Sequence, residues 1–311
     1  MKDEKSEMTN ILLEAGTNEL EIVEFKIGEC YYGINVAKVQ EIIRFPEALV
    51  DVPNSHNSVE GIMNLRGNVV PIMNLPKHLG KAPVVNQASS RIIVSEFNKF
   101  TVGFWVDSVS RIHRLSWNQV ESPSGVFSSG ETYVVAVVKM DDRIILLLDF
   151  EKITSDISPE CGLQKAEVVD YKANSVSFDR KTKTILVAED STFIRDMILE
   201  YLKAAGYNTH SVTNGQEAWD IMSEFSGNSA SKVEDKYQLL ITDIEMPMMD
   251  GLHLIKNIKE DRNLKHVPCV VFSSMITDEL CLKCKSVGAD GEITKPEIEN
   301  LVDLVDRLIL Q

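Results

Sequence analysis

The sequence predicts a multidomain protein with an all-β N-terminal half and an α/β C-terminal half built on a parallel sheet. Its 311 residues are too many for one typical core and suit two domains. From Leu20 to Phe150, short β-type runs alternate with Gly, Pro and Asn, which is typical of β-barrels or a sandwich. After Thr184, short apolar strands alternate with longer helical periods, which indicates a parallel sheet with crossover helices.

The N-terminal half contains an internal repeat. Residues 33–44 (GINVAKVQEIIR) and 103–114 (GFWVDSVSRIHR) share their glycine, their apolar positions and their final arginine. Residues 68–75 and 143–150 are a second matching pair, which predicts two small β units of similar build. The alternative is that any two β-rich stretches share apolar alternation. The predicted strands are Ile22–Ile27, Val69–Met73, Arg91–Phe97, Tyr133–Val138 and Ile144–Leu148.

This half carries no recognisable catalytic pattern. His56, His78 and His113 have no Cys or carboxylate at ligand spacing, and neither a Ser/His/Asp arrangement nor a Gly-rich phosphate loop is present. We therefore expect a binding module.

Composition excludes several classes of protein. A formal charge of −15 without a basic run argues against nucleic acid, and 44% apolar residues argue against wholesale disorder. The sequence has no apolar run of the roughly 20 residues that cross a bilayer, and residues 1–10 lack a signal-peptide pattern.

We expect a cytoplasmic protein whose five cysteines are free. Cys281 and Cys284 lie in a predicted helix without a second ligand pair, so we expect no metal there.

Acidic residues follow two predicted strands of the C-terminal half. Glu189 and Asp190 follow strand 184–188, just before Ser191 caps a helix, and Asp243 follows strand 239–242. The carboxyl ends of parallel strands share one edge of the sheet, so these acids meet in one crevice. Because like charges this close destabilise one another, we expect a divalent cation, and Mg²⁺ fits an open pocket best.

Two further strands end in groups that can bind phosphate. Strand 269–272 is followed by Ser273, and strand 292–294 is followed by Lys295. A nucleophilic carboxylate, a metal, a hydroxyl and a lysine are the parts that phosphoryl transfer needs. Asp243 is the best-placed nucleophile, and the turn at Pro247 and Gly251 could present its carboxylate and a backbone carbonyl to one ion.

Residues 183–311 resemble a response-regulator receiver of the CheY kind. The motif D-x-x-M-P-x-M-D-G begins at Asp243, with E-D upstream and Ser and Lys-Pro downstream. The resemblance implies a flavodoxin-like (βα)5 fold with Asp243 as phosphoacceptor. It also implies metal binding by Glu189, Asp190, Asp243 and the Glu245 carbonyl, a switch hydroxyl on Ser273 and phosphate binding by Lys295.

Three features depart from the family pattern. Glu189 replaces the usual Asp, and Glu292 replaces an aromatic residue three positions before the lysine. A polar insert near residues 226–235 precedes the Asp243 strand, and we interpret it as a longer surface loop.

Residues 15–155 resemble the CheW family, above all in residues 61–72 (GIMNLRGNVVPI). The resemblance implies two SH3-like barrels, with Glu41, Gly61 and Arg66 at positions that contact kinase or receptor. Alternatives remain for each residue: a solvated strand charge for Glu41, a backbone conformation for Gly61, and local carbonyl bonding for Arg66.

The combination of the two halves resembles the CheV family of chemotaxis coupling proteins. We expect a tail (1–14), a coupling domain (15–155), a linker (156–182) and a receiver (183–311). The resemblance implies an adaptor between chemoreceptor tips and the histidine kinase CheA at membrane-bound receptor arrays, regulated through Asp243. Other coupling proteins are further candidate partners. Alternative functions are a phosphate sink that drains CheA, and a pseudo-receiver that never takes phosphate.

Overall fold

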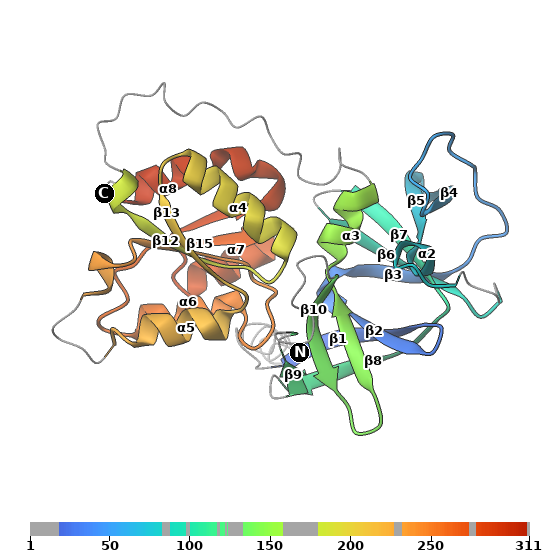
Figure 1. Ribbon diagram of the computed structural model, residues 1–311, viewed down its shortest axis with the longest axis horizontal. Helices are drawn as coiled ribbons and strands as arrows, with labels where there is room; N and C mark the ends of the chain where they lie inside the picture. The colour runs from blue at the N-terminus through green and yellow to red at the C-terminus, as the bar shows by residue number, and fades with distance from the viewer. Residues whose placement is uncertain are drawn as a thin grey trace, which may run out of the picture. The chain divides into compact units, whose positions relative to one another are not determined.

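The computed structural model describes residues 19–82, 88–97, 100–116, 119–121, 123, 133–157, 180–226, 232–273 and 278–309 (Figure 1). One compact unit spans Glu19–Gln164, and the described residues from Arg180 to Ile309 belong to a second. The predicted tail 1–14 and most of the predicted linker 156–182 lie outside the described residues. In the described part of the chain, no helix has both the length and the apolar character needed to cross a bilayer.

The N-terminal unit contains two sheets. The first has the order β8 (Ser108–Ser116), β1 (Glu19–Ile27), β2 (Cys30–Asn35), β11 (Ile144–Leu148), β10 (Val134–Lys139), β9 (Val120–Glu121). The second has the order β3 (Val39–Arg44), β6 (Arg91–Phe97), β7 (Phe100–Val106), β5 (Asn68–Asn74), β4 (Val59–Leu65). The short helices are η1 (Val36–Lys38), α2 (Leu75–His78) and α3 (Phe150–Ile157).

The predicted internal repeat is confirmed, with an exchange of strands that the sequence did not predict. In each sheet an antiparallel pair, β1–β2 or β6–β7, is joined by a parallel strand, β11 or β5. The strand that follows each pair leaves its own sheet. β3 pairs with β6, and β8 pairs with β1, so each repeat completes the sheet of the other.

Gly33 and Gly103 occupy equivalent places in the two sheets. A Cβ atom on either would lie 2.6 Å from a side chain of the neighbouring parallel strand, Leu147 or Ile72. The repeated glycine is therefore explained by the close approach of these strands. Equivalent helices follow: Asn74 accepts a hydrogen bond from the Lys77 N–H, and Asp149 accepts one from the Lys152 N–H.

The second unit is built on a five-stranded parallel sheet. Its order is β13 (Asn208–Val212), β12 (Thr184–Ala188), β14 (Leu239–Thr242), β15 (Cys269–Ser273), β16 (Gly291–Thr294). The helices are η4 (Arg180–Thr182), α4 (Thr192–Ala204), α5 (Gly215–Ser223), η5 (Val233–Asp235), α6 (Gly251–Glu260), α7 (Asp278–Ser286), η6 (Lys295–Asn300) and α8 (Leu301–Ile309). Figure 1 shows α4 and α8 on one face of the sheet and α5 and α6 on the other. This is the doubly wound, flavodoxin-like order predicted above.

Local predictions for this unit are confirmed closely. Ser191 caps α4, whose buried residues are the five apolar positions of the predicted helix: Ile194, Met197, Ile198, Tyr201 and Leu202. Cys281 and Cys284 lie on helix α7 as predicted, with Cys284 buried and Cys281 partly exposed.

Candidate functional site

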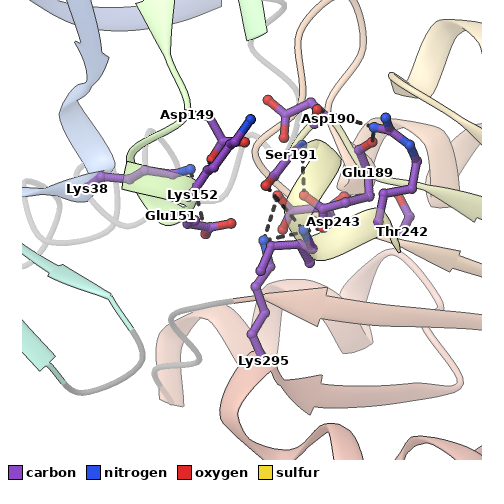
Figure 2. Close-up of polar contacts among 12 residues, drawn as sticks. Lys38, Asp149, Glu151, Lys152, Glu189, Asp190, Ser191, Thr242, Asp243 and Lys295 are labelled. Carbon is purple, nitrogen blue, oxygen red and sulfur yellow. Dashed lines mark hydrogen bonds and ion pairs between the residues drawn. The ribbon is translucent and has the colours of Figure 1, made fainter. Parts of the chain in front are cut away.

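The predicted phosphate-binding and acidic residues meet at the carboxyl edge of the parallel sheet. Glu189 and Asp190 directly follow β12, Asp243 follows β14, and Lys295 follows β16. Glu189 and Lys295 are completely buried, and the exposed fraction of Asp243 is 3%. Figure 2 shows Glu189 and Asp243 beside the end of the Lys295 side chain.

The three acids form one cluster, and the lysine contacts two of them. Glu189, Asp190 and Asp243 each place a carboxylate oxygen within 4.8 Å of the others. The Lys295 Nζ lies 3.3 Å from Glu189 Oε2 and 3.4 Å from Asp243 Oδ2. The ammonium group thus contacts two of the three clustered carboxylates and offsets part of their charge. A hard divalent cation, which prefers carboxylate oxygens, fits the remaining negative charge.

Backbone contacts hold the two acid-bearing strand ends in register. The Asp243 N–H donates to the Ala188 carbonyl across 2.9 Å, which extends the β12–β14 pairing to the phosphoacceptor candidate. The Ser191 N–H donates to Glu189 Oε1 at 3.2 Å, and Ser191 Oγ accepts from the Ile194 N–H at 3.3 Å. The start of α4 therefore orients the Glu189 carboxylate.

The loop after Asp243 is packed tightly against the residue it follows. A Cβ on Gly251 would lie 1.9 Å from the Asp243 carbonyl oxygen, so only glycine fits this position. The Gly251 N–H donates to the Ile244 carbonyl at 3.0 Å and closes the predicted turn. Met248 within it has a φ of 70°, in the left-handed region. Glu245 lies in this turn and is partly buried, and metal binding by its carbonyl stays a prediction.

Ser273 reaches the same edge as the last residue of β15. Its exposed fraction is 5%, and it pairs in the sheet with Thr294, the residue before Lys295. The hydroxyl and the ammonium group are therefore carried by adjacent strand ends. Glu292, which stands where the family has an aromatic, is partly buried on β16 and lines a cavity of about 550 Å³. None of Glu189, Asp190 and Asp243 lines that cavity.

The structure brings two of the three predicted partner-binding residues together. The Arg66 Nη2, from the β4–β5 turn, donates to Glu41 Oε2 on β3 at 2.9 Å. The exposed fraction of the Arg66 side chain is 78%. Gly61 on β4 has a φ of 145°, and a Cβ there would lie 2.6 Å from the Val50 carbonyl oxygen. A backbone role thus accounts for Gly61, while contacts of all three residues with partners stay predictions.

Two of the histidines that have no carboxylate at ligand spacing in the sequence, His78 and His113, have one beside them in the structure. His113 Nε2 on β8 lies 2.8 Å from Glu24 Oε2 on β1, and both side chains are buried. Burial raises the pKa of Glu24, but hydrogen bonds from His113, Arg143 and Ser110 outweigh burial and hold that pKa below its ordinary value. His78 Nε2 lies 3.6 Å from Asp156 Oδ2. These partners are far apart in the chain, so residue spacing could not reveal them.

Comparison with known proteins matches each unit separately. Residues 21–158 match the CheW-like domain, and residues 185–306 match the response regulator receiver domain. The chain is 28% identical over 305 residues to chemotaxis protein CheV3 of Helicobacter pylori, covering 94% of this chain and 95% of that protein. It is 24% identical to CheV2 of the same organism, covering 89% of this chain and 90% of that protein. It is 33% identical over 145 residues to chemotaxis protein CheW of Thermotoga maritima, covering 47% of this chain and 94% of that protein.

Fold, acidic cluster and comparisons together define a signalling protein in which a coupling domain is joined to a receiver domain. More particularly, the chain belongs to the CheV type of chemotaxis coupling protein, a CheW-like domain followed by a response regulator receiver.

Proposed function

We propose that this protein links chemoreceptors to the histidine kinase CheA through its CheW-like domain, and that phosphorylation of Asp243 regulates this link during adaptation. The observation that carries the proposal is the cluster of buried Asp243, Glu189 and Lys295 with half-buried Asp190, in the same chain as a coupling domain. We assign the coupling domain to residues 15–155 and the receiver to 183–311, joined by a linker.

In the proposed reaction, the Asp243 carboxylate oxygen attacks the phosphorus of a phosphohistidine on CheA. A P–O bond forms as the P–N bond breaks, and the released imidazole takes up a proton. Mg²⁺, held by Asp190, Asp243, Glu189 and the Glu245 carbonyl, would neutralise charge on the phosphoryl oxygens. Lys295 and Ser273 then contact the phosphoryl group.

Phosphorylation would act on the coupling domain through charge. A phosphoryl group adds about two negative charges at this edge and draws Lys295 and Ser273 toward it. This movement shifts the receiver between two conformations that differ at its surface. We propose that the altered surface changes which partner the coupling domain holds. The protein would then work in the cytoplasm at receptor arrays.

The decisive experiment incubates phosphorylated CheA with this protein and measures transfer and receptor-complex binding together. We expect wild type to gain an acid-labile phosphoryl group, and Asp243→Asn to gain none while still binding CheA and receptors. A wild-type protein that takes no phosphate from CheA or from acetyl phosphate with Mg²⁺ would be a pseudo-receiver, contrary to the proposal.

The same cluster also supports a second function, a phosphate sink. In that case the coupling domain only tethers the receiver near CheA, and Asp243 loses its phosphoryl group to water. A sink predicts that Asp243→Asn slows the loss of phosphate from competing regulators without altering receptor-complex binding. A regulated adaptor instead predicts that phosphorylation of wild type alters that binding.

A further inference from the structure

Arg195 contacts the acidic loop although no motif includes it. It lies on α4, four residues after the capping Ser191, and its side chain is partly buried. The guanidinium turns back toward the end of β12. Its Nη1 donates to the carbonyl oxygens of Glu189 at 2.7 Å and Asp190 at 3.3 Å, and its Nη2 donates to Thr192 Oγ1 at 3.2 Å.

These contacts fix a stretch of backbone that lies between two regular elements. The Glu189 N–H still donates to the Val212 carbonyl, as a continuation of the β12–β13 pairing. After it, the chain leaves the sheet, and α4 begins at Thr192. Holding the Glu189 and Asp190 carbonyls fixes the two peptide planes on either side of Asp190. Those planes set the direction in which the Asp190 side chain leaves the backbone.

We infer that Arg195 is a positioning residue for the cation site, acting through the direction of Asp190. The inference rests on the proposed function, because it assumes a divalent cation between Asp190 and Asp243. The planar guanidinium suits this role, since it holds several acceptors in one fixed geometry, which the ammonium group of lysine does not. Partners that orient metal ligands typically contribute a factor of 10–100 to metal affinity.

The positive charge of Arg195 acts in the opposite direction. A cation this close to the acids repels an incoming metal ion, so charge removal alone would tighten metal binding. The positioning and charge effects therefore predict opposite changes for Arg195→Gln. Arg195→Lys keeps the charge and loses the planar geometry, which separates the two effects.

The test measures Mg²⁺ affinity of the full chain by isothermal titration calorimetry. Wild type, Arg195→Lys, Arg195→Gln and the control Lys203→Gln are compared; Lys203 is an exposed cation in the last turn of the same helix. We expect both Arg195 variants to bind Mg²⁺ about 10-fold more weakly and the control to bind like wild type. An Arg195→Gln variant that binds as tightly as wild type, or more tightly, overturns the inference. Should that variant fail to fold, unchanged affinity of Arg195→Lys has the same meaning.

A second readout separates positioning from general damage. With acetyl phosphate, the Mg²⁺ concentration for half-maximal phosphorylation of Asp243 should rise about 10-fold in Arg195→Lys, while the rate at saturating Mg²⁺ stays near wild type. A lower saturating rate with unchanged half-maximal Mg²⁺ overturns the inference. If wild type itself binds no Mg²⁺, the proposed function fails as well; if wild type binds and the variants match it, only the role of Arg195 fails.

Discussion

At the scale of single residues, Gly251 determines how closely the loop after Asp243 packs. Gly251→Ala would place a methyl group on the Asp243 carbonyl oxygen, and the Asp243 N–H is already fixed to Ala188. We expect a loss of about 1–3 kcal/mol in the free energy of unfolding of the receiver, together with slower phosphorylation. Urea denaturation and acetyl phosphate labelling measure the two effects. A variant with wild-type stability and labelling rate would contradict the packing described here.

His78 gives the N-terminal unit a pH dependence. Burial lowers the pKa of His78 below its ordinary 6.5, although Asp156 partly opposes this. The folded state therefore binds a proton less readily than the unfolded chain. Stability contributed by neutral His78 is present above pH 6.5 and is lost as the pH falls toward the lowered folded-state pKa.

We expect His78→Gln to reduce the loss of stability of this unit between about pH 7.5 and about pH 5. The urea midpoint at each pH measures it. His266→Gln, at an exposed histidine of the other unit, is the control. A His78→Gln variant that keeps the full wild-type slope with pH would exclude this role.

At the scale of elements, a buried contact between a carboxylate and a histidine distinguishes the two similar sheets of the coupling domain. Glu24 on β1 contacts His113 on β8, whereas the equivalent pair in the other sheet is Val94 on β6 and Ile43 on β3. Wrong pairing of β3 with β1 would bury Glu24 against an isoleucine. It would also remove the hydrogen bonds from His113 and Ser110, both on β8, and leave the buried Glu24 carboxylate with Arg143 as its remaining side-chain partner of the three. Because an under-satisfied buried carboxylate is costly, we expect the Glu24–His113 pair to specify which third strand completes which sheet.

Replacing one partner of this pair should therefore cost more than replacing both. We expect Glu24→Val to lower the free energy of unfolding by about 3–5 kcal/mol, and the double variant Glu24→Val/His113→Ile to lose less than the sum of the single losses. Urea denaturation of all four proteins measures the coupling. Glu121→Gln, which breaks an exposed ion pair with Lys139, should change stability by less than about 1 kcal/mol. Additive losses would show that the pair does not act as a unit.

Sequence reasoning succeeded where local pattern decides structure. β6, β11, β12 and β14 have the predicted limits, because short buried apolar runs between turn residues leave few alternatives. The sequence pattern does not indicate β13, since this edge strand carries Thr209 and Ser211 and is only partly buried. The acids and lysine of the cluster were predictable because each directly follows a strand. The exchange of β3 and β8 was not, because a strand pattern does not name its pairing partner.

At the scale of the whole molecule, two compact units predict two separate unfolding events. Scanning calorimetry should resolve two transitions, and Mg²⁺ should raise only the transition of the receiver, which holds the acidic cluster. At a Mg²⁺ concentration of about 100 times the Kd, the stabilisation should be about 2.7 kcal/mol, or on the order of 10 °C in Tm. The control is Asp243→Asn, whose receiver transition should respond less. A single unfolding transition, or equal shifts in the Tm of both transitions, would contradict separate unfolding of the two units.

The exchanged strands also affect how the chain folds as it is synthesised. β1 and β2 leave the ribosome early, yet the edge of β1 stays open until β8, some eighty residues later in the chain, has emerged. The sheet that contains β1 and β2 therefore stays incomplete during synthesis of the first repeat. Until then its unpaired edge is exposed to other nascent chains, and a translational pause once residue 116 has left the ribosome would allow β8 to dock before the receiver is made.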